Sequence, residues 1–162
     1  MPGIRLHPSY HGYALDDPRL KELLARAAAR KLVVQLALKL EDVRTQHRMG
    51  RVDTADAKPL VAVMKAIPDL RLVLLNALAD LRPPLLGELS AAGNVWFEIS
   101  ALEGVGGLET LRKQVRPDRI LFGSHAPFLT WDAARLKVQE AGLEEAEARS
   151  LFETNARGLI DA

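Results

Sequence analysis

The chain has 162 residues, enough for one domain with a substantial core, and its 48% apolar and 27% charged residues are typical of a globular protein. A formal net charge of +1 gives no electrostatic reason to expect nucleic acid or an anionic membrane as a partner. The absence of cysteine excludes disulfides, thiolate nucleophiles and cysteine metal sites.

The sequence carries no sign of a membrane or secretory segment. No apolar run approaches the roughly 18 residues that a membrane helix needs, and the start, MPGIRLHP, lacks the regions of a signal peptide. Since the lack of cysteine also suits a reducing compartment, we expect a cytoplasmic protein.

Five short apolar segments predict the strands of a sheet. In chain order they are residues 4–7, 31–38, 71–76, 95–100 and 119–122. The second segment, KLVVQLAL, is apolar almost throughout, which favours a strand covered on both faces, as in a parallel sheet.

Helical patterns separate these segments. Asp17 and Pro18 predict an N-cap and first turn of a helix that runs to about Arg30. Further helices are predicted at residues 54–66, with a kink or late start at Pro59, and at 83–92, 108–115, 131–141 and 144–159. Strand and helix therefore alternate, which predicts one α/β domain over residues 1–162 with parallel strands and right-handed crossovers.

The last predicted strand leads directly into Gly123, Ser124 and His125. In α/β folds the chemistry lies at the carboxyl ends of parallel strands, so this stretch is the first place to expect a site. His125 is a candidate metal ligand or proton acceptor, or else a histidine hydrogen-bonded to loop backbone. Ser124 has no evident base, so we expect it to contact a substrate rather than to act as a nucleophile.

Two other histidines are candidate partners of His125 at the same rim. His7 ends the first strand, and His11 follows four residues later in a loop that also holds Tyr10. Three neutral imidazoles and a water can bind zinc, although this spacing matches no metal signature. We expect His7, Tyr10 and His11 to contact a substrate. If a metal binds, we expect His7 and His125 to hold it.

Two further polar residues end strands. Glu98 suits acid–base catalysis if buried, because a low-dielectric site raises the pKa of a carboxyl group; the alternative is a salt bridge to a residue such as Arg5. Asn76 cannot titrate, so it either orients a ligand or water or simply ends its strand.

Six segments of the chain also resemble a known family. They are GIRLHPSYHGYALDDP, LVVQLAL, LRLVLLNAL, NVWFEIS, DRILFGSHAP and LFETNARGLI. In this order they resemble the carboxyl-terminal part of the amidohydrolase-related family of metal-dependent TIM-barrel hydrolases and decarboxylases. The last two segments are the most specific, through a Gly-Ser-x-x-Pro stretch ending at Pro127 and a tail with Asn155, Ala156 and Leu159.

The resemblance implies a partial (β/α) TIM barrel that contains about the last five of eight strands, with two carboxyl-terminal helices, and lacks the first three strands. It implies a metal-dependent hydrolase or decarboxylase acting on a small carbonyl substrate with a divalent metal, zinc or manganese. His125 stands where the family has a metal-binding aspartate that handles the proton of the attacking water, so His125, with Glu98, is the expected catalytic pair.

The family's other metal-binding positions differ in this chain. The His-x-His pair of the first strand is absent, and Asn76 stands where the family has another histidine. The residues nearest a further ligand position are Gln35, Ala37 and Lys39. A site without metal is therefore an equal alternative. The alternative to an enzyme is a non-catalytic remnant of the barrel, a pseudoenzyme that binds a small ligand or a partner.

Five strands cannot close a barrel with normal tilt and shear. An open, curved sheet would leave two edges unpaired and side chains such as Val33, Leu72, Leu74 and Phe97 in water. Either the sheet flattens into an open layer covered on both faces, or two copies associate, or another chain supplies the missing strands. Of these we expect a homo-oligomer or a complementing chain.

Overall fold

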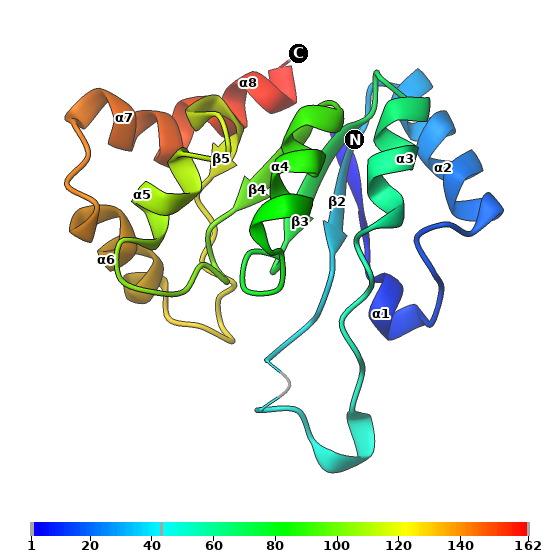
Figure 1. The fold of residues 1–162 in the computed structure, drawn as a ribbon, viewed down its shortest axis with the longest axis horizontal. Coiled ribbons are helices and arrows are strands. Elements are labelled where there is room, and N and C mark those ends of the chain that lie inside the picture. Colours follow the sequence, from blue (N-terminus) through cyan, green and yellow to red (C-terminus); the bar gives the residue numbers. More distant parts are fainter. Residues whose placement is uncertain (1, 43, 162) are drawn as a thin grey trace.

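The computed structural model describes residues 2–42 and 44–161, which form one parallel sheet with helices packed around it (Figure 1). The strands lie side by side in the order of the sequence, and each pairs in parallel with the next. They are β1 Gly3–Leu6, β2 Val33–Ala37, β3 Arg71–Leu75, β4 Val95–Glu98 and β5 Ile120–Leu121. The predicted α/β fold with five parallel strands is confirmed.

The crossovers between the parallel strands contain helices, as parallel pairing requires. The α-helices are α1 Pro8–His11, α2 Pro18–Ala29, α3 Pro59–Ala66, α4 Pro83–Ala92, α5 Gly107–Arg112, α6 Trp131–Glu140, α7 Glu145–Arg149 and α8 Asn155–Asp161. Two short 3₁₀ helices, η1 Arg48–Gly50 and η2 Pro117–Arg119, and a π-helical turn, η3 Ser150–Thr154, complete the set. In the described part of the chain, no helix combines the length and apolar character needed to cross a membrane.

Local sequence explains where several helices begin. The Asp17 carboxylate accepts a 2.8 Å hydrogen bond from the backbone N–H of Arg19, and the Arg19 side chain binds the same carboxylate. These bonds lower the pKa of Asp17 to about 2. Helix α3 begins at Pro59 rather than at residue 54, because proline suits the first helical turn, where its missing N–H is not needed. The loop after β1 forms one helical turn, α1, that the sequence pattern did not predict.

The two faces of the sheet bury different side chains, as the two-residue period of a strand requires. The outer face packs against the helices through Val34, Leu36, Leu72, Leu74, Phe97 and Ile120. The inner face carries a smaller cluster in which Leu159 of α8 covers Val33, Val73, Trp96 and Leu121.

The expectation that Leu72, Leu74 and Phe97 would meet water is wrong. All three are 0% exposed, because they point to the outer face beneath the helices. Val33 does lie on the inner face, but α8 covers it and leaves it 6% exposed. The open side of the sheet is therefore partly filled by the carboxyl-terminal helix of the same chain.

The two edges of the sheet differ in their hydrogen bonding. At β5 the backbone N–H of Phe122 donates to the carbonyl of Leu151 at 3.1 Å, and the amide of Asn155 donates to the carbonyl of Ile120 at 2.8 Å. The carboxyl-terminal segment thus occupies this edge. Strand β1 pairs with β2 on one side and, in the described residues, with no strand on the other.

Candidate functional site

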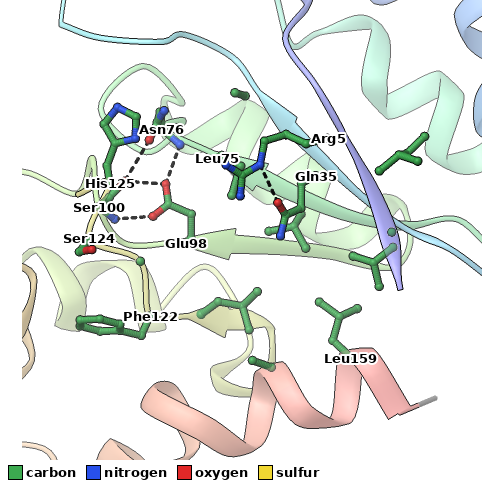
Figure 2. A pocket seen from close by; sticks show the side chains of 18 of the residues that line it. Arg5, Gln35, Leu75, Asn76, Glu98, Ser100, Phe122, Ser124, His125 and Leu159 are labelled. Carbon is green, nitrogen blue, oxygen red and sulfur yellow. Dashed lines mark hydrogen bonds between the residues drawn. The ribbon is translucent and has the colours of Figure 1, made fainter. Parts of the chain in front are cut away.

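A cavity of about 620 Å³ lies against the inner face of the sheet (Figure 2). Its floor is formed by inner-face side chains of β1, β2 and β3, among them Arg5, Gln35 and Val73. Helix α8 closes one side through Leu159. The carboxyl ends of the strands supply its polar rim, which consists of His7, Asn76, Glu98, Ser100, Ser124 and His125.

Arg5 and Gln35 form a polar pair on the cavity floor. They are register partners on β1 and β2, and the Arg5 Nε donates to Gln35 Oε1 at 2.8 Å. The other N–H groups of this exposed guanidinium have no side-chain or backbone acceptor among the described residues. A guanidinium held from one side in this way presents a planar fork that suits a carboxylate.

Glu98 is buried, at 5% exposure, and its carboxylate is held by three hydrogen bonds. The backbone N–H of Asn76 donates at 2.6 Å, the backbone N–H of Ser100 at 2.8 Å and the Ser100 hydroxyl at 2.6 Å. Such bonds offset the cost of removing a charge from water. Among the described contacts Glu98 forms no ion pair with Arg5, so the salt bridge considered from the sequence is wrong.

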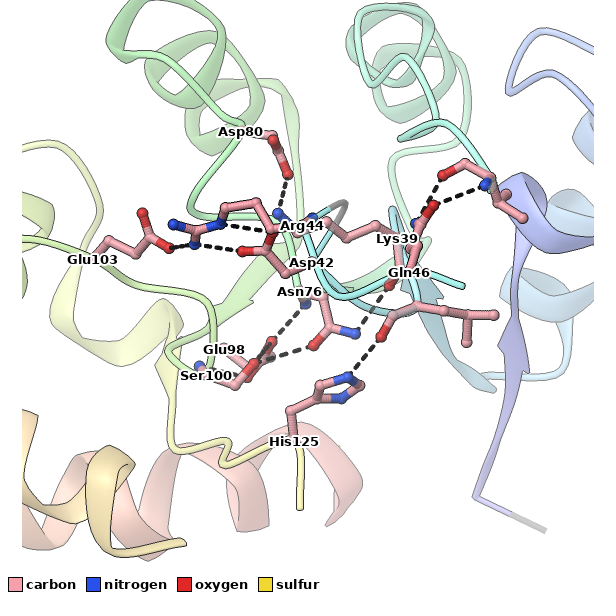
Figure 3. A network of polar contacts seen from close by, with 12 residues as sticks. Lys39, Asp42, Arg44, Gln46, Asn76, Asp80, Glu98, Ser100, Glu103 and His125 are labelled. Atoms are coloured by element: carbon pink, nitrogen blue, oxygen red, sulfur yellow. Dashed lines mark hydrogen bonds and ion pairs between the residues drawn. The ribbon is translucent and has the colours of Figure 1, made fainter. Parts of the chain in front are cut away.

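Hydrogen bonds from these residues tie neighbouring strand ends together (Figure 3). The Asn76 amide donates to the carbonyl of Lys39 at 3.0 Å, which joins the end of β3 to the segment after β2. His125 Nε2 lies 2.7 Å from the carbonyl oxygen of Leu40 in the same segment. Because a carbonyl only accepts, Nε2 carries the proton in this contact.

The backbone at the rim is unusual at two of the predicted site residues. Asn76 and His125 both have a φ of +53°, in the left-handed region that non-glycine residues seldom occupy. Between them the chain passes so close to Glu98 that a Cβ on Gly123 would lie 2.0 Å from Glu98 Oε2. Strained and crowded backbone of this kind is concentrated at functional sites.

His7 also lines the cavity, and its Nδ1 is buried without a hydrogen-bond partner in the structure. Burial, with smaller contributions from Arg5 and His11, lowers the pKa of His7 below its ordinary value. The ring centroids of His7 and His11 are 6.3 Å apart, and the rings of Tyr10 and His11 meet edge to face. His11 and Tyr10 lie on α1, outside the cavity lining.

The structure therefore brings five of the seven predicted site residues to one cavity, namely His7, Asn76, Glu98, Ser124 and His125. Sequence reasoning did not assign Arg5, Gln35 or Ser100 to it. The strand period contained a signal for the first two, because Arg5 shares a face of its strand with residues 3 and 7, and Gln35 shares a face of its strand with residues 33 and 37.

The donors at this rim do not fit a resident metal ion. Within residues 2–42 and 44–161 no three His, Asp or Glu side chains are grouped to hold one. Both oxygens of Glu98 accept hydrogen bonds from Asn76 or Ser100, and His125 Nε2 is bound to Leu40. A catalytic zinc site usually has three protein ligands, and the described residues present no such set.

Comparison with known proteins places this arrangement in a wider group. The family model described as Amidohydrolase matches residues 1–161. No curated protein matches the chain. Amidohydrolase 2 from Bifidobacterium longum subsp. infantis superposes with a TM-score of 0.68 at 20% identity, over 99% of this chain and 61% of that one.

Two decarboxylases share the fold. A 2,6-dihydroxybenzoate decarboxylase from Rhizobium has a TM-score of 0.64 at 17% identity, over 92% of this chain and 57% of that one. A dihydroxybenzoic acid decarboxylase from Polaromonas sp. JS666, with bound manganese and the inhibitor 2-nitroresorcinol, has a TM-score of 0.67 at 14% identity, over 92% and 55%. At these identities the likeness shows the fold alone. The chain spans 55% to 61% of the length of these three proteins.

Proposed function

The chain belongs to the amidohydrolase family. We propose that its inner-face cavity binds a small carbonyl compound bearing a carboxylate, which is the substrate of a hydrolase or decarboxylase reaction. The observation that carries this proposal is the Arg5–Gln35 pair on the cavity floor. Arg5 would bind the carboxylate, and Gln35 would hold the guanidinium in place.

The position of this pair relative to the rim supports the assignment. A ligand anchored at Arg5, in mid-strand, would extend towards the strand ends, where Ser124 and His125 line the same cavity. Ser124 would contact the carbonyl group. His125 would accept or donate a proton through Nδ1, since its Nε2 is bound to Leu40.

Glu98 has a positioning role in this scheme. Its hydrogen bonds to Asn76 and Ser100 hold the ends of β3 and β4 at a fixed separation beside His125. Dihydroxybenzoic acid decarboxylase from Polaromonas binds manganese, but the donors among the described residues of this chain do not fit a metal, so we derive no step through one.

The alternative function is a non-catalytic binding module. It is favoured by the same observation on the donors: the carboxylate oxygens of Glu98 are engaged, and no three-ligand group exists in the described residues. This alternative shares the cavity and the role of Arg5 and differs only in turnover.

We also propose that β1 pairs with a strand of a second copy or of a complementing chain, which would supply the barrel strands that these five lack. The β5 edge is occupied by Leu151 and Asn155, whereas the described residues place no strand beside β1. Arg5→Pro would remove an edge N–H that does not serve the β1–β2 ladder, and light scattering would then show fewer or smaller assemblies. A cytoplasmic location, without nucleic-acid or membrane partners, stays a prediction from composition.

Calorimetric titration with 2,6-dihydroxybenzoate tests the binding proposal, with resorcinol as the analogue that lacks the carboxylate. Arg5→Met should weaken 2,6-dihydroxybenzoate binding by about tenfold or more, because hydrogen bonds to charged groups are strong. Arg30→Met, at an exposed position after α2, should leave binding unchanged. Equal binding by wild type and Arg5→Met would refute the assignment.

Product formation then separates the two functions. Release of carbon dioxide from 2,6-dihydroxybenzoate, followed with and without added manganese, would identify an enzyme. Binding that depends on Arg5 without any turnover would identify the binding module.

A further inference from the structure

The Arg5–Gln35 pair divides the inner-face cavity into two unlike parts. Among the described residues, every charged or polar side chain that lines the cavity belongs either to this pair or to the polar rim at the carboxyl ends of the strands. The part on the other side of the pair, towards the starts of β1 and β2, is lined by Gly3 and Val33 of the sheet and by Leu159 and Ile160 of α8. We refer to this part as the apolar end.

Strand register places the apolar end directly beside the polar pair. Gly3 pairs with Val33 two positions before Arg5 pairs with Gln35, and side chains two positions apart on a strand share a face. Gly3 has no side chain to fill the space at this level. The rim lies in the opposite direction from Arg5 and Gln35, and Leu159 faces the sheet from α8 (Figure 2).

Helix α8 is fixed in place as the opposite wall of the apolar end. The Arg71 guanidinium donates to the backbone carbonyl of Leu159 at 2.9 Å, and the Leu159 side chain packs in the same cluster as Val33 with 5% exposure. Ile160 lies on the same wall but is 56% exposed. Ile160 can therefore contact a ligand without being part of the core.

A ligand bound at Arg5 has space on both sides of its carboxylate. Towards the rim it meets hydrogen-bonding groups such as Ser124, and towards the apolar end it meets no polar side chain among the described residues. Water in the apolar end has few hydrogen-bond partners, so an apolar group that displaces this water gains free energy. The cavity volume of about 620 Å³ leaves room for such a group, since small-molecule sites span roughly 300–1,000 Å³.

We infer that the substrate is a carboxylic acid whose α-carbon carries two further groups, a carbonyl group directed to the rim and an apolar substituent that fills the apolar end. A 2-substituted 3-oxo acid and a half-ester of a 2-substituted malonic acid both have this arrangement. Leu159 and Ile160 are the specificity-determining residues, because they contact the substituent rather than the carboxylate. This inference rests on the proposed function, since it takes Arg5 to bind the carboxylate.

Calorimetric titration of the full chain with monomethyl malonate and with monomethyl 2-benzylmalonate tests the inference, because the two compounds differ only in the apolar substituent. Wild type should bind the benzyl compound about tenfold or more tightly, since its ring leaves water. Ile160→Asn should lower this preference by about threefold or more and leave the affinity for monomethyl malonate within about twofold. Leu136→Asn, at a 57% exposed position on α6 outside the cavity lining, is the matched control and should keep the preference.

The Arg5→Met variant separates this inference from the proposed function. Equal binding of the two compounds by wild type, with weaker binding of both by Arg5→Met, would overturn the inference and leave the proposed function standing. A preference for the benzyl compound that Ile160→Asn leaves unchanged would overturn the assignment of the apolar end to the substituent. If Arg5→Met changes the affinity for neither compound, the proposed function fails and the inference fails with it.

Discussion

The backbone N–H of Asn76 donates a 2.6 Å hydrogen bond to the buried carboxylate of Glu98, which joins the end of β3 to the end of β4. Asn76 in turn donates to the carbonyl of Lys39, beyond β2. The geometry of the rim thus depends on one buried charge that is stabilised by neighbouring backbone.

Glu98→Gln should lower the free energy of unfolding by about 1–3 kcal/mol, because it weakens the charge-assisted bonds and places an NH₂ group among backbone donors. Urea denaturation measures the change. Glu88→Gln, at an exposed position on α4, is the control and should stay within about 0.5 kcal/mol of wild type. An equally small effect of Glu98→Gln would show that the charge is not needed for the rim.

Gly123→Ala should lower the free energy of unfolding by about 1–3 kcal/mol, since the new Cβ would lie 2.0 Å from Glu98 Oε2. The matched change is Gly87→Ala in α4, where no atom lies within 4 Å of the added Cβ. That variant should be more stable than wild type by about 0.5–1 kcal/mol, because alanine favours the helix. Thermal unfolding of the two variants should therefore shift in opposite directions.

Asn155→Ala should destabilise the fold by about 1–2 kcal/mol and promote aggregation. The Asn155 amide donates at 2.8 Å to the carbonyls of both Pro117 and Ile120, so its loss leaves the β5 edge without these donors. Chemical denaturation and light scattering report the two effects. Arg157→Ala removes only a surface ion pair with Glu153 and should change stability by less than about 1 kcal/mol.

His7 makes the stability of the fold depend on pH. Its pKa is lowered in the folded state, so on acidification the unfolded chain takes up the proton first. The fold therefore loses stability as the pH falls below about 6.5, the ordinary pKa of histidine, until folded His7 is also protonated. The loss between pH 7.5 and pH 5 in wild type should be larger than in His7→Asn, measured by urea denaturation at both pH values. An identical loss in both proteins would assign it to other groups.

Much of the fold was predictable because the sequence of a buried parallel strand is a continuous run of apolar residues. The segments around Val34, Leu72 and Phe97 became β2, β3 and β4, and the Asp17–Pro18 pair began α2 as expected. Element limits were less predictable. Helix α1 and the π-helical turn η3 have no periodic pattern of their own, because their shape depends on what they pack against.

The candidate site was predictable in place but not in its bonds. Parallel strands end at one rim, so His7, Asn76, Glu98 and His125 were expected there together. The hydrogen bonds of Glu98 with Asn76 and Ser100 were not predictable, because they depend on the exact path of the loops.

The sequence by itself determined the order of the elements, the parallel sheet and the set of polar residues at its carboxyl ends, because apolar periodicity and turn chemistry are local properties. Only the tertiary structure decided which face of the sheet is covered and that α8 fills part of the open side through Leu159. It also decided that both carboxylate oxygens of Glu98 accept hydrogen bonds within the protein, while Arg5 donates one to Gln35. Those outcomes depend on contacts between residues far apart in the chain, and the pattern of the sequence does not encode such contacts residue by residue.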